Sequence, residues 1–121
     1  ITIKNLFIIN GATANGNVDI GIYNSAFAKI VTAGSTAQSG TNAVQAFSVT
    51  QGLAAGLYYM ALVMASATQT TVFRTTTGIQ RLRMLGFTQE ASALPLPATM
   101  TPAQLASAFI PLFGITTKAT V

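Results

Sequence analysis

The sequence predicts an all-β fold, and three patterns indicate it. Apolar runs of strand length are separated at short intervals by turn signals such as Asn10-Gly11 and Asn24-Ser25. Several of these runs alternate apolar and polar side chains, which is the period of a strand with one buried face. No window carries the sustained apolar stripe of an amphipathic helix. Together the patterns argue against helical bundles and α/β folds.

The first half of the chain supplies four predicted strands. Residues 1–9 form an apolar run, and residues 18–23 (VDIGIY) follow with strict alternation. The even positions of that second strand are apolar, whereas Asp19, Gly21 and Tyr23 share the other face, so we expect it to be half-buried. Residues 27–33 form the third strand. Residues 43–50 alternate again after a polar loop and form the fourth.

Residues 57–65 are the most apolar strand candidate in the chain. Apolar residues occupy both of its faces, which predicts a central strand covered on each side. The uncharged run that contains it, residues 52–67, is shorter than the roughly twenty residues that a membrane-spanning helix needs. We therefore expect no membrane insertion, and a further β-branched strand over residues 69–75.

The last third is less regular. Residues 79–87 fit either a strand or a short helical turn, and both interpretations stay open. Residues 88–100 form a long connection, and its prolines within residues 94–97 (LPLP) favour extended backbone, so we expect this segment to form a polyproline-like strap across the sandwich. Thr101-Pro102-Ala103-Gln104 has the order of a capping box and predicts one helical turn near Pro102. The final run, 109–116, contains Pro111, which a sheet tolerates in an edge strand or at a bulge.

Seven to eight short strands at this spacing predict a single antiparallel β-sandwich domain over residues 1–121, with a jelly-roll-like topology. The composition is unusual for such a domain, because half of the residues are hydrophobic and only 7% are charged. An ordinary soluble domain has about 25% charged residues. A surface with so little charge repulsion predicts burial against other chains.

The residue types argue against catalysis. The chain has no His and no Cys, so it lacks the groups of Ser-His and Cys-His nucleophilic pairs. Its two acids, Asp19 and Glu90, lie far apart in the sequence, and nothing predicts that they flank one bond or hold a metal. We therefore predict no enzyme activity, no catalytic or metal-binding residue and no cofactor.

Six Lys and Arg residues and two acids give a net charge of +4, but only Arg81 and Arg83 among the cations are close together. Nucleic-acid binders cluster many more cations on one face, so we expect no nucleic-acid partner. In a strand, Arg81 and Arg83 would point to the same side. They would then contact an acidic subunit or phosphorylated glycan, or simply form a solvated rim.

Three other residues are candidates for ligand or subunit contact. Asp19 would bind a sugar hydroxyl, or would serve a structural role with an Arg or Lys or as a turn acceptor. Tyr23 and Tyr58 offer rings on which sugars stack. Tyr58 and Tyr59 must point to opposite faces of their strand, so at most one of them serves a given surface.

Four segments carry a resemblance: VDIGIYN at 18–24, GLYYMAL at 56–62, ASALPLPA at 91–98 and IPLFG at 110–114. Over residues 17–114 the chain resembles structural proteins of tailed-bacteriophage virions. The resemblance implies a jelly-roll-like module in a capsid decoration, fibre or tail-associated protein, located in the virion. It implies partners among other virion subunits and copies of itself, with a trimer favoured, and host surface glycans. A secreted carbohydrate-binding module is the alternative function.

Overall fold

The computed structural model describes residues 1–65, 68–75, 78–90, 94–106 and 109–120. In this part of the chain antiparallel strands predominate and there is one short helix, so the all-β prediction is confirmed. Eleven strands replace the seven to eight expected, because several have only two or three residues. In order, the elements are β1 (Thr2–Ile9), β2 (Asn17–Asn24), β3 (Lys29–Thr32), β4 (Thr36–Ala37), β5 (Val44–Gly52), β6 (Tyr58–Met64), β7 (Phe73–Thr75), α1 (Ile79–Met84), β8 (Thr88–Gln89), β9 (Ala103–Gln104), β10 (Phe109–Pro111) and β11 (Phe113–Thr116).

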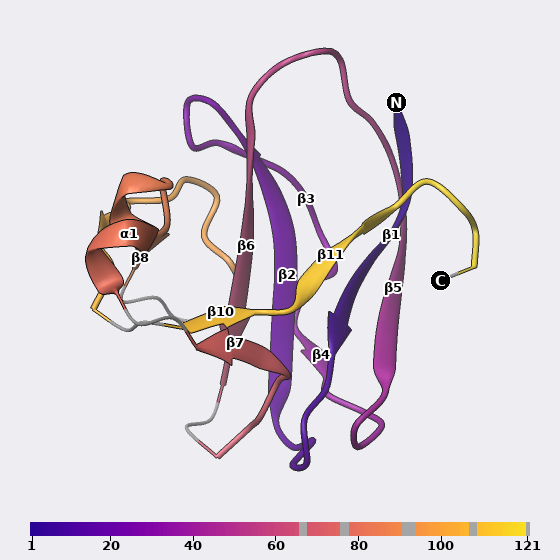
Figure 1. The fold of residues 1–121 in the computed structure, drawn as a ribbon. Helices are drawn as coiled ribbons and strands as arrows, with labels where there is room; N and C mark the ends of the chain where they lie inside the picture. The colour runs from indigo at the N-terminus through magenta and orange to yellow at the C-terminus, as the bar shows by residue number, and fades with distance from the viewer. Residues whose placement is uncertain (66–67, 76–77, 91–93, 107–108, 121) are drawn as a thin grey trace.

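One sheet has the order β11-β1-β5, with β1 in the centre (Figure 1). Phe7 of β1 lies opposite Gly114 of β11. A Cβ atom on Gly114 would come within 2.7 Å of the Phe7 ring, so the ring packs directly over the glycine backbone. This cross-strand contact requires glycine at position 114, because any side chain would displace the ring.

The second sheet is built on β2, with β3 and β4 on one edge and β6 on the other. The pairing of β6 with β2 runs from Tyr58 to Met64 without a bulge. Residues 57–65 were predicted to be the central strand, and this is wrong for the described residues, where β2 is the only strand that pairs with β6. The central position belongs to β2.

The core lies between these two sheets. Its fully buried side chains come mainly from the inward faces of the two central strands, namely Ile3, Leu6 and Ile8 of β1, Val18, Ile20 and Ile22 of β2, and Phe47 of β5. The even positions of β2 therefore face the core, as the alternation predicted. Burial of each such side chain stabilises the fold by about 1.5–3 kcal/mol.

The odd positions of β2 are buried too, so the prediction of a half-buried strand is wrong. Asp19 and Tyr23 both have 0% exposure. The covering segment comprises residues 94–100, which we call the strap. Its Leu96 is buried and lies so close to Gly21 that a Cβ there would meet the Leu96 side chain at 3.0 Å. For residues 94–100 the expected position across a sheet is confirmed, whereas residues 88–89 of the predicted strap form β8 instead. The Leu94–Pro95 peptide bond is cis.

The helix lies elsewhere than the capping box predicted. Residues 79–84 form α1, which is the helical alternative for that segment, and Leu82 is its buried anchor. The predicted helical turn near Pro102 is wrong, because Ala103 and Gln104 form β9 and pair with β8. Thr101 donates to the Glu90 carboxylate from its backbone N–H at 2.6 Å and from its hydroxyl at 3.5 Å, so this residue binds a different segment instead of starting a helix. Pro111 lies in β10, which pairs only with β7 among the described residues, so its predicted edge position is confirmed.

A network of neutral amide side chains joins the loops at one end of the sheets. Gln38 donates to the Asn10 side chain and to the Thr70 carbonyl, both at 2.8 Å. Asn10 in turn donates to the Gln45 side chain at 3.0 Å, and Gln69 donates to the Asn17 carbonyl at 3.1 Å. Asn10, Gln38 and Gln69 are buried, so these bonds satisfy polar groups that water cannot reach.

Candidate functional site

Asp19 is closed off from solvent between β3 and the strap. Its carboxylate accepts hydrogen bonds from the Thr32 hydroxyl and from the Leu96 backbone N–H, the latter at 3.0 Å. Both partners are neutral, whereas the structural interpretation from sequence had included an Arg or Lys. With 0% exposure, the carboxylate is unavailable to a sugar at the surface, which favours a structural role.

Tyr23 belongs to the same buried assembly. Its hydroxyl donates to the Pro97 carbonyl of the strap at 2.7 Å. Burial, and then the negative charges of Asp19 and Glu90, raise the pKa of this hydroxyl to about 12. Both carboxylates therefore lie near enough to influence Tyr23, although the sequence did not predict that they approach a common residue. A ring in this position is not exposed for stacking on a sugar.

The two arginines do not form the pair that a strand would have produced. They lie on α1, where residues two apart point in different directions. The Arg83 guanidinium donates from Nε and Nη2 to the Leu105 carbonyl at 3.0 and 2.7 Å, whereas Arg81 is exposed. Arg83 thus ties α1 to the segment after β9, and Arg81 is left as the solvated cation.

Tyr58 and Tyr59 point to opposite faces of β6, as predicted. Tyr58 packs against the core, and its hydroxyl donates to the Ala54 carbonyl at 3.0 Å. Tyr59 instead contacts the ring of Phe27, with ring centroids 5.0 Å apart. Both tyrosines also line a groove that runs along β6.

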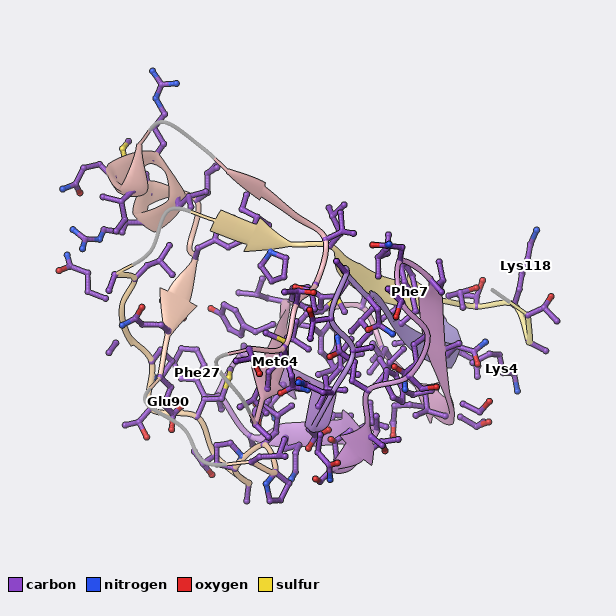
Figure 2. All side chains as sticks on the ribbon, turned by 90° about the horizontal axis from the view of Figure 1, so that it is seen from below. Lys4, Phe7, Phe27, Met64, Glu90 and Lys118 are labelled. Atoms are coloured by element: carbon purple, nitrogen blue, oxygen red, sulfur yellow. The ribbon has the colours of Figure 1, made fainter. Side chains whose placement is uncertain are left out.

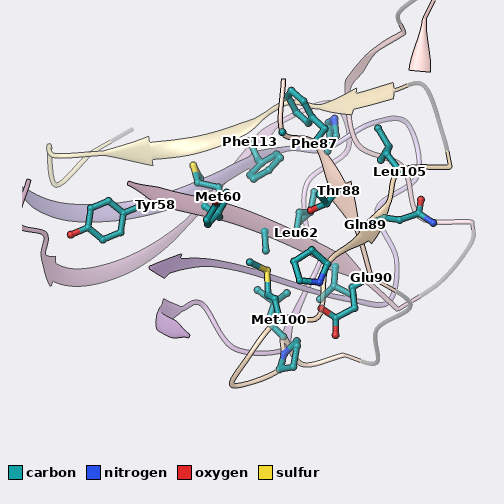
Figure 3. Close-up of a pocket in the computed structure, with 18 of the residues that line it drawn as sticks. Tyr58, Met60, Leu62, Phe87, Thr88, Gln89, Glu90, Met100, Leu105 and Phe113 are labelled. Atoms are coloured by element: carbon teal, nitrogen blue, oxygen red, sulfur yellow. The ribbon is translucent and has the colours of Figure 1, made fainter. Parts of the chain in front are cut away.

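This groove has a volume of about 490 Å³. Its floor is β6, and its far side is formed by residues 85–90 with Pro102 and Leu105. Figure 3 shows Met60 and Leu62 in the middle, with Phe113 on one side of β6 and Met100 on the other. Sequence reasoning missed this site, because its walls come from segments that are far apart in the chain.

Glu90 carries the only formal charge among the described residues that line the groove. It is half-buried, and its carboxylate accepts from the Thr101 N–H and hydroxyl. Lys4 and Lys118 lie on the opposite side of the molecule from Glu90 (Figure 2). The groove is therefore an apolar channel with one acidic position, remote from these two cations.

The described residues contain no group of three or more His, Cys, Asp or Glu side chains that could hold a metal ion. Nor do they include a helix with the length and hydrophobicity that crossing a membrane requires.

Comparisons with known proteins add no family to this description. No family model, no curated protein and no solved structure matches the chain.

Proposed function

We propose that this chain is a non-enzymatic structural subunit of a tailed-bacteriophage virion, in a capsid decoration, a fibre or a tail tip. It acts by assembling with copies of itself and with other virion subunits, and its two sheets are the layers of a jelly-roll-like sandwich. The sequence resemblance supports the virion setting. The antiparallel sheets and their shared core are compatible with the sandwich.

One observation carries the assembly role: large apolar side chains are exposed on a surface that has few charges. Met84 is 87% exposed and the adjacent Leu85 is 73% exposed, at the end of α1. Five further large apolar side chains are more than a third exposed, namely Ile1, Val44, Leu57, Val72 and Leu112. Scattered single residues of this kind are ordinary, but an adjacent pair so fully in water favours burial by a partner.

The experiment compares assembly of the chain with that of a charged variant. Wild-type protein should form homo-oligomers, with a trimer favoured, and Met84→Lys/Leu85→Lys should shift the population toward monomer in multi-angle light scattering. Ala46→Lys/Thr50→Lys on the exposed side of β5 adds the same charge and serves as the control. A wild-type chain that stays monomeric at high concentration, and that mass spectrometry does not find in purified particles, would overturn the proposal.

The alternative function is a secreted carbohydrate-binding module, and the position of Tyr59 among the residues that line the groove favours it specifically. An aromatic ring can stack on a sugar, and the groove also has Gln89 and Glu90 among its lining residues to bind sugar hydroxyls. This function predicts a monomer that binds on a glycan array. Loss of binding in Tyr59→Ala would then support it over assembly.

A further inference from the structure

The outer edge of β6 presents backbone groups that have no partner in the described part of the chain. Ala65 N donates to the Asn17 carbonyl, so the backbone N–H and C=O groups at odd-numbered positions of β6 and β2 point toward each other. At the even-numbered position 20 of β2, the carbonyl points away from β6 and accepts from Ala33 N. Amide groups alternate along an antiparallel strand. The N–H and C=O groups of Met60 and Leu62 must therefore point away from β2, toward the groove.

This edge lacks the devices by which sheets protect themselves. Natural edge strands carry Lys or Pro, contain a bulge or are very short. In contrast, β6 has seven residues (YYMALVM), no charge, no proline and no bulge in its pairing with β2. An unprotected apolar edge of this length is a template for one more strand.

The groove has the shape that such a strand needs. Side chains of an added strand would alternate between the two faces of the sheet. On the core face they would meet Phe113, which packs against the core, and Pro111. On the other face they would meet Leu96, Pro97 and Met100 of the strap. Both walls are apolar, so an extended segment with apolar side chains on both faces fits.

The charge of the lining residues limits which peptide the groove can accept. Glu90 is the only charged group among the described lining residues, and no Lys or Arg lines the groove. We propose that the groove accepts an extended peptide strand from another polypeptide, which adds to the edge of β6, is mainly apolar and places one Lys or Arg beside Glu90. This mode of binding takes its affinity from main-chain hydrogen bonds and its specificity from the side-chain pockets. The inference rests on the fold and not on the virion setting.

The first test uses a display library of random nine-residue peptides as the probe against the whole chain. Enriched peptides should share alternating apolar positions and one basic residue. A synthetic copy of an enriched peptide should bind, and the same copy with alternate backbone amides N-methylated should bind at least about tenfold more weakly, since the loss of one net hydrogen bond has this size.

Matched variants of the protein locate the binding. Leu62→Pro removes the outward N–H, whereas Leu62→Val makes a similar change in side-chain size and keeps that N–H. We expect Leu62→Pro to bind at least about tenfold more weakly than Leu62→Val, which controls for the change in side-chain size. Glu90→Gln should weaken the binding of a Lys-containing peptide severalfold and leave the affinity for its norleucine analogue unchanged.

Three outcomes would overturn the proposal. In the first, the library enriches no peptide; in the second, N-methylation and Leu62→Pro both leave the affinity unchanged. If Leu62→Pro fails to fold, the N-methylated peptide alone decides the matter. In the third outcome, glycan binding or self-association depends on the groove while no peptide is enriched, which would assign it to a sugar or to a second copy. Particle association is measured separately, so failure here is distinguishable from failure of the proposed function.

Discussion

At one edge of the sheet built on β2, the strap pairs with the start of β3, whereas at the other edge β6 faces an open groove. Lys29 N donates to the Ala98 carbonyl at 2.8 Å, and Met100 N donates to the Phe27 carbonyl at 3.0 Å. The strap then crosses β2, where Asp19 and Tyr23 hold it. No comparable contact reaches the outer edge of β6 within the described residues.

The difference shows that the strap and the residues after it cover the β3 edge of this sheet and leave the β6 edge open. Toward β3 the strap is held by polar contacts, including one from the Lys29 ammonium to the Leu96 carbonyl at 2.8 Å. On the β6 side, Pro102 and Leu105, which follow the strap, line the groove beside β6. The closed edge should therefore be sensitive to loss of single polar groups, and the open edge should be permissive.

The largest expected effect is at Asp19. Asp19→Ala leaves the Thr32 hydroxyl and the Leu96 N–H without their acceptor in a buried site, so the free energy of unfolding should fall by about 3 kcal/mol. Urea denaturation measures this. Thr32→Val should lose about half as much. An Asp19→Ala protein with wild-type stability would mean that the strap is not held through this carboxylate.

Tyr23 should make the closed edge sensitive to alkali. The folded pKa is about 12, above the usual value of 10.0, so the contribution of this group is fully present below pH 10. As pH rises from 10 through 12, the unfolded chain loses its proton first and stability falls by about 2–3 kcal/mol. Tyr23→Phe should remove this slope, at a cost of about 1 kcal/mol at neutral pH from the lost bond to Pro97.

The control for this titration is Tyr59→Phe, which removes a hydroxyl from β6 and keeps Tyr23. Urea denaturation at several pH values gives the free energy of unfolding of wild type and of each variant. The difference between them distinguishes the contribution of Tyr23 to the pH dependence from that of the lysines. A slope that persists in Tyr23→Phe would contradict the assignment.

A smaller effect is expected where the strap crosses β2. A Cβ on Gly21 would meet the Val31 carbonyl oxygen at 2.9 Å as well as Leu96, so Gly21→Ala must displace a strand or the strap. We expect destabilisation by about 1–2 kcal/mol. Gly52→Ala is the matched control, because nothing lies within 4 Å of its Cβ position. Equal melting temperatures for the two variants would argue against close contact at Gly21.

The smallest expected effect is a difference in the exchange rates of backbone amide hydrogens along β6, the open edge. Amide hydrogens of Met60 and Leu62 should exchange at least about a hundredfold faster than those of Ala61 and Val63, which point toward β2. Nuclear magnetic resonance of the free chain measures this directly. Uniform protection along β6 would show that its outer edge is already covered.

The predictable part of this fold was the part with a local signal. Alternation in residues 18–23 identified β2 and its core face, because the strand period depends only on neighbouring side chains. Burial of its second face depends on Leu96, whose sequence position does not indicate where it packs. A strand buried on both faces by a remote segment looks half-buried from its own sequence.

The candidate site was less predictable for the same reason. The capping-box order at Thr101 was a genuine local pattern, but Glu90 binds that residue and β8 pairs with the segment that follows. Tertiary contacts overrode the local preference. Arg81 and Arg83 were paired on the strand interpretation, and α1 separates them. Asp19 and Tyr23 were noticed as unusual, yet they hold the strap and do not line the groove.

The amide network formed by Asn10, Gln38, Gln45 and Gln69 has a consequence for the conditions that the protein can withstand. None of these side chains ionises between strongly acidic and strongly alkaline pH, and salt does not screen hydrogen bonds between neutral amides. Salt or acid, which weakens ion pairs in other proteins, therefore does not act directly on these loop contacts. This end of the molecule is joined by bonds that are indifferent to ionic surroundings.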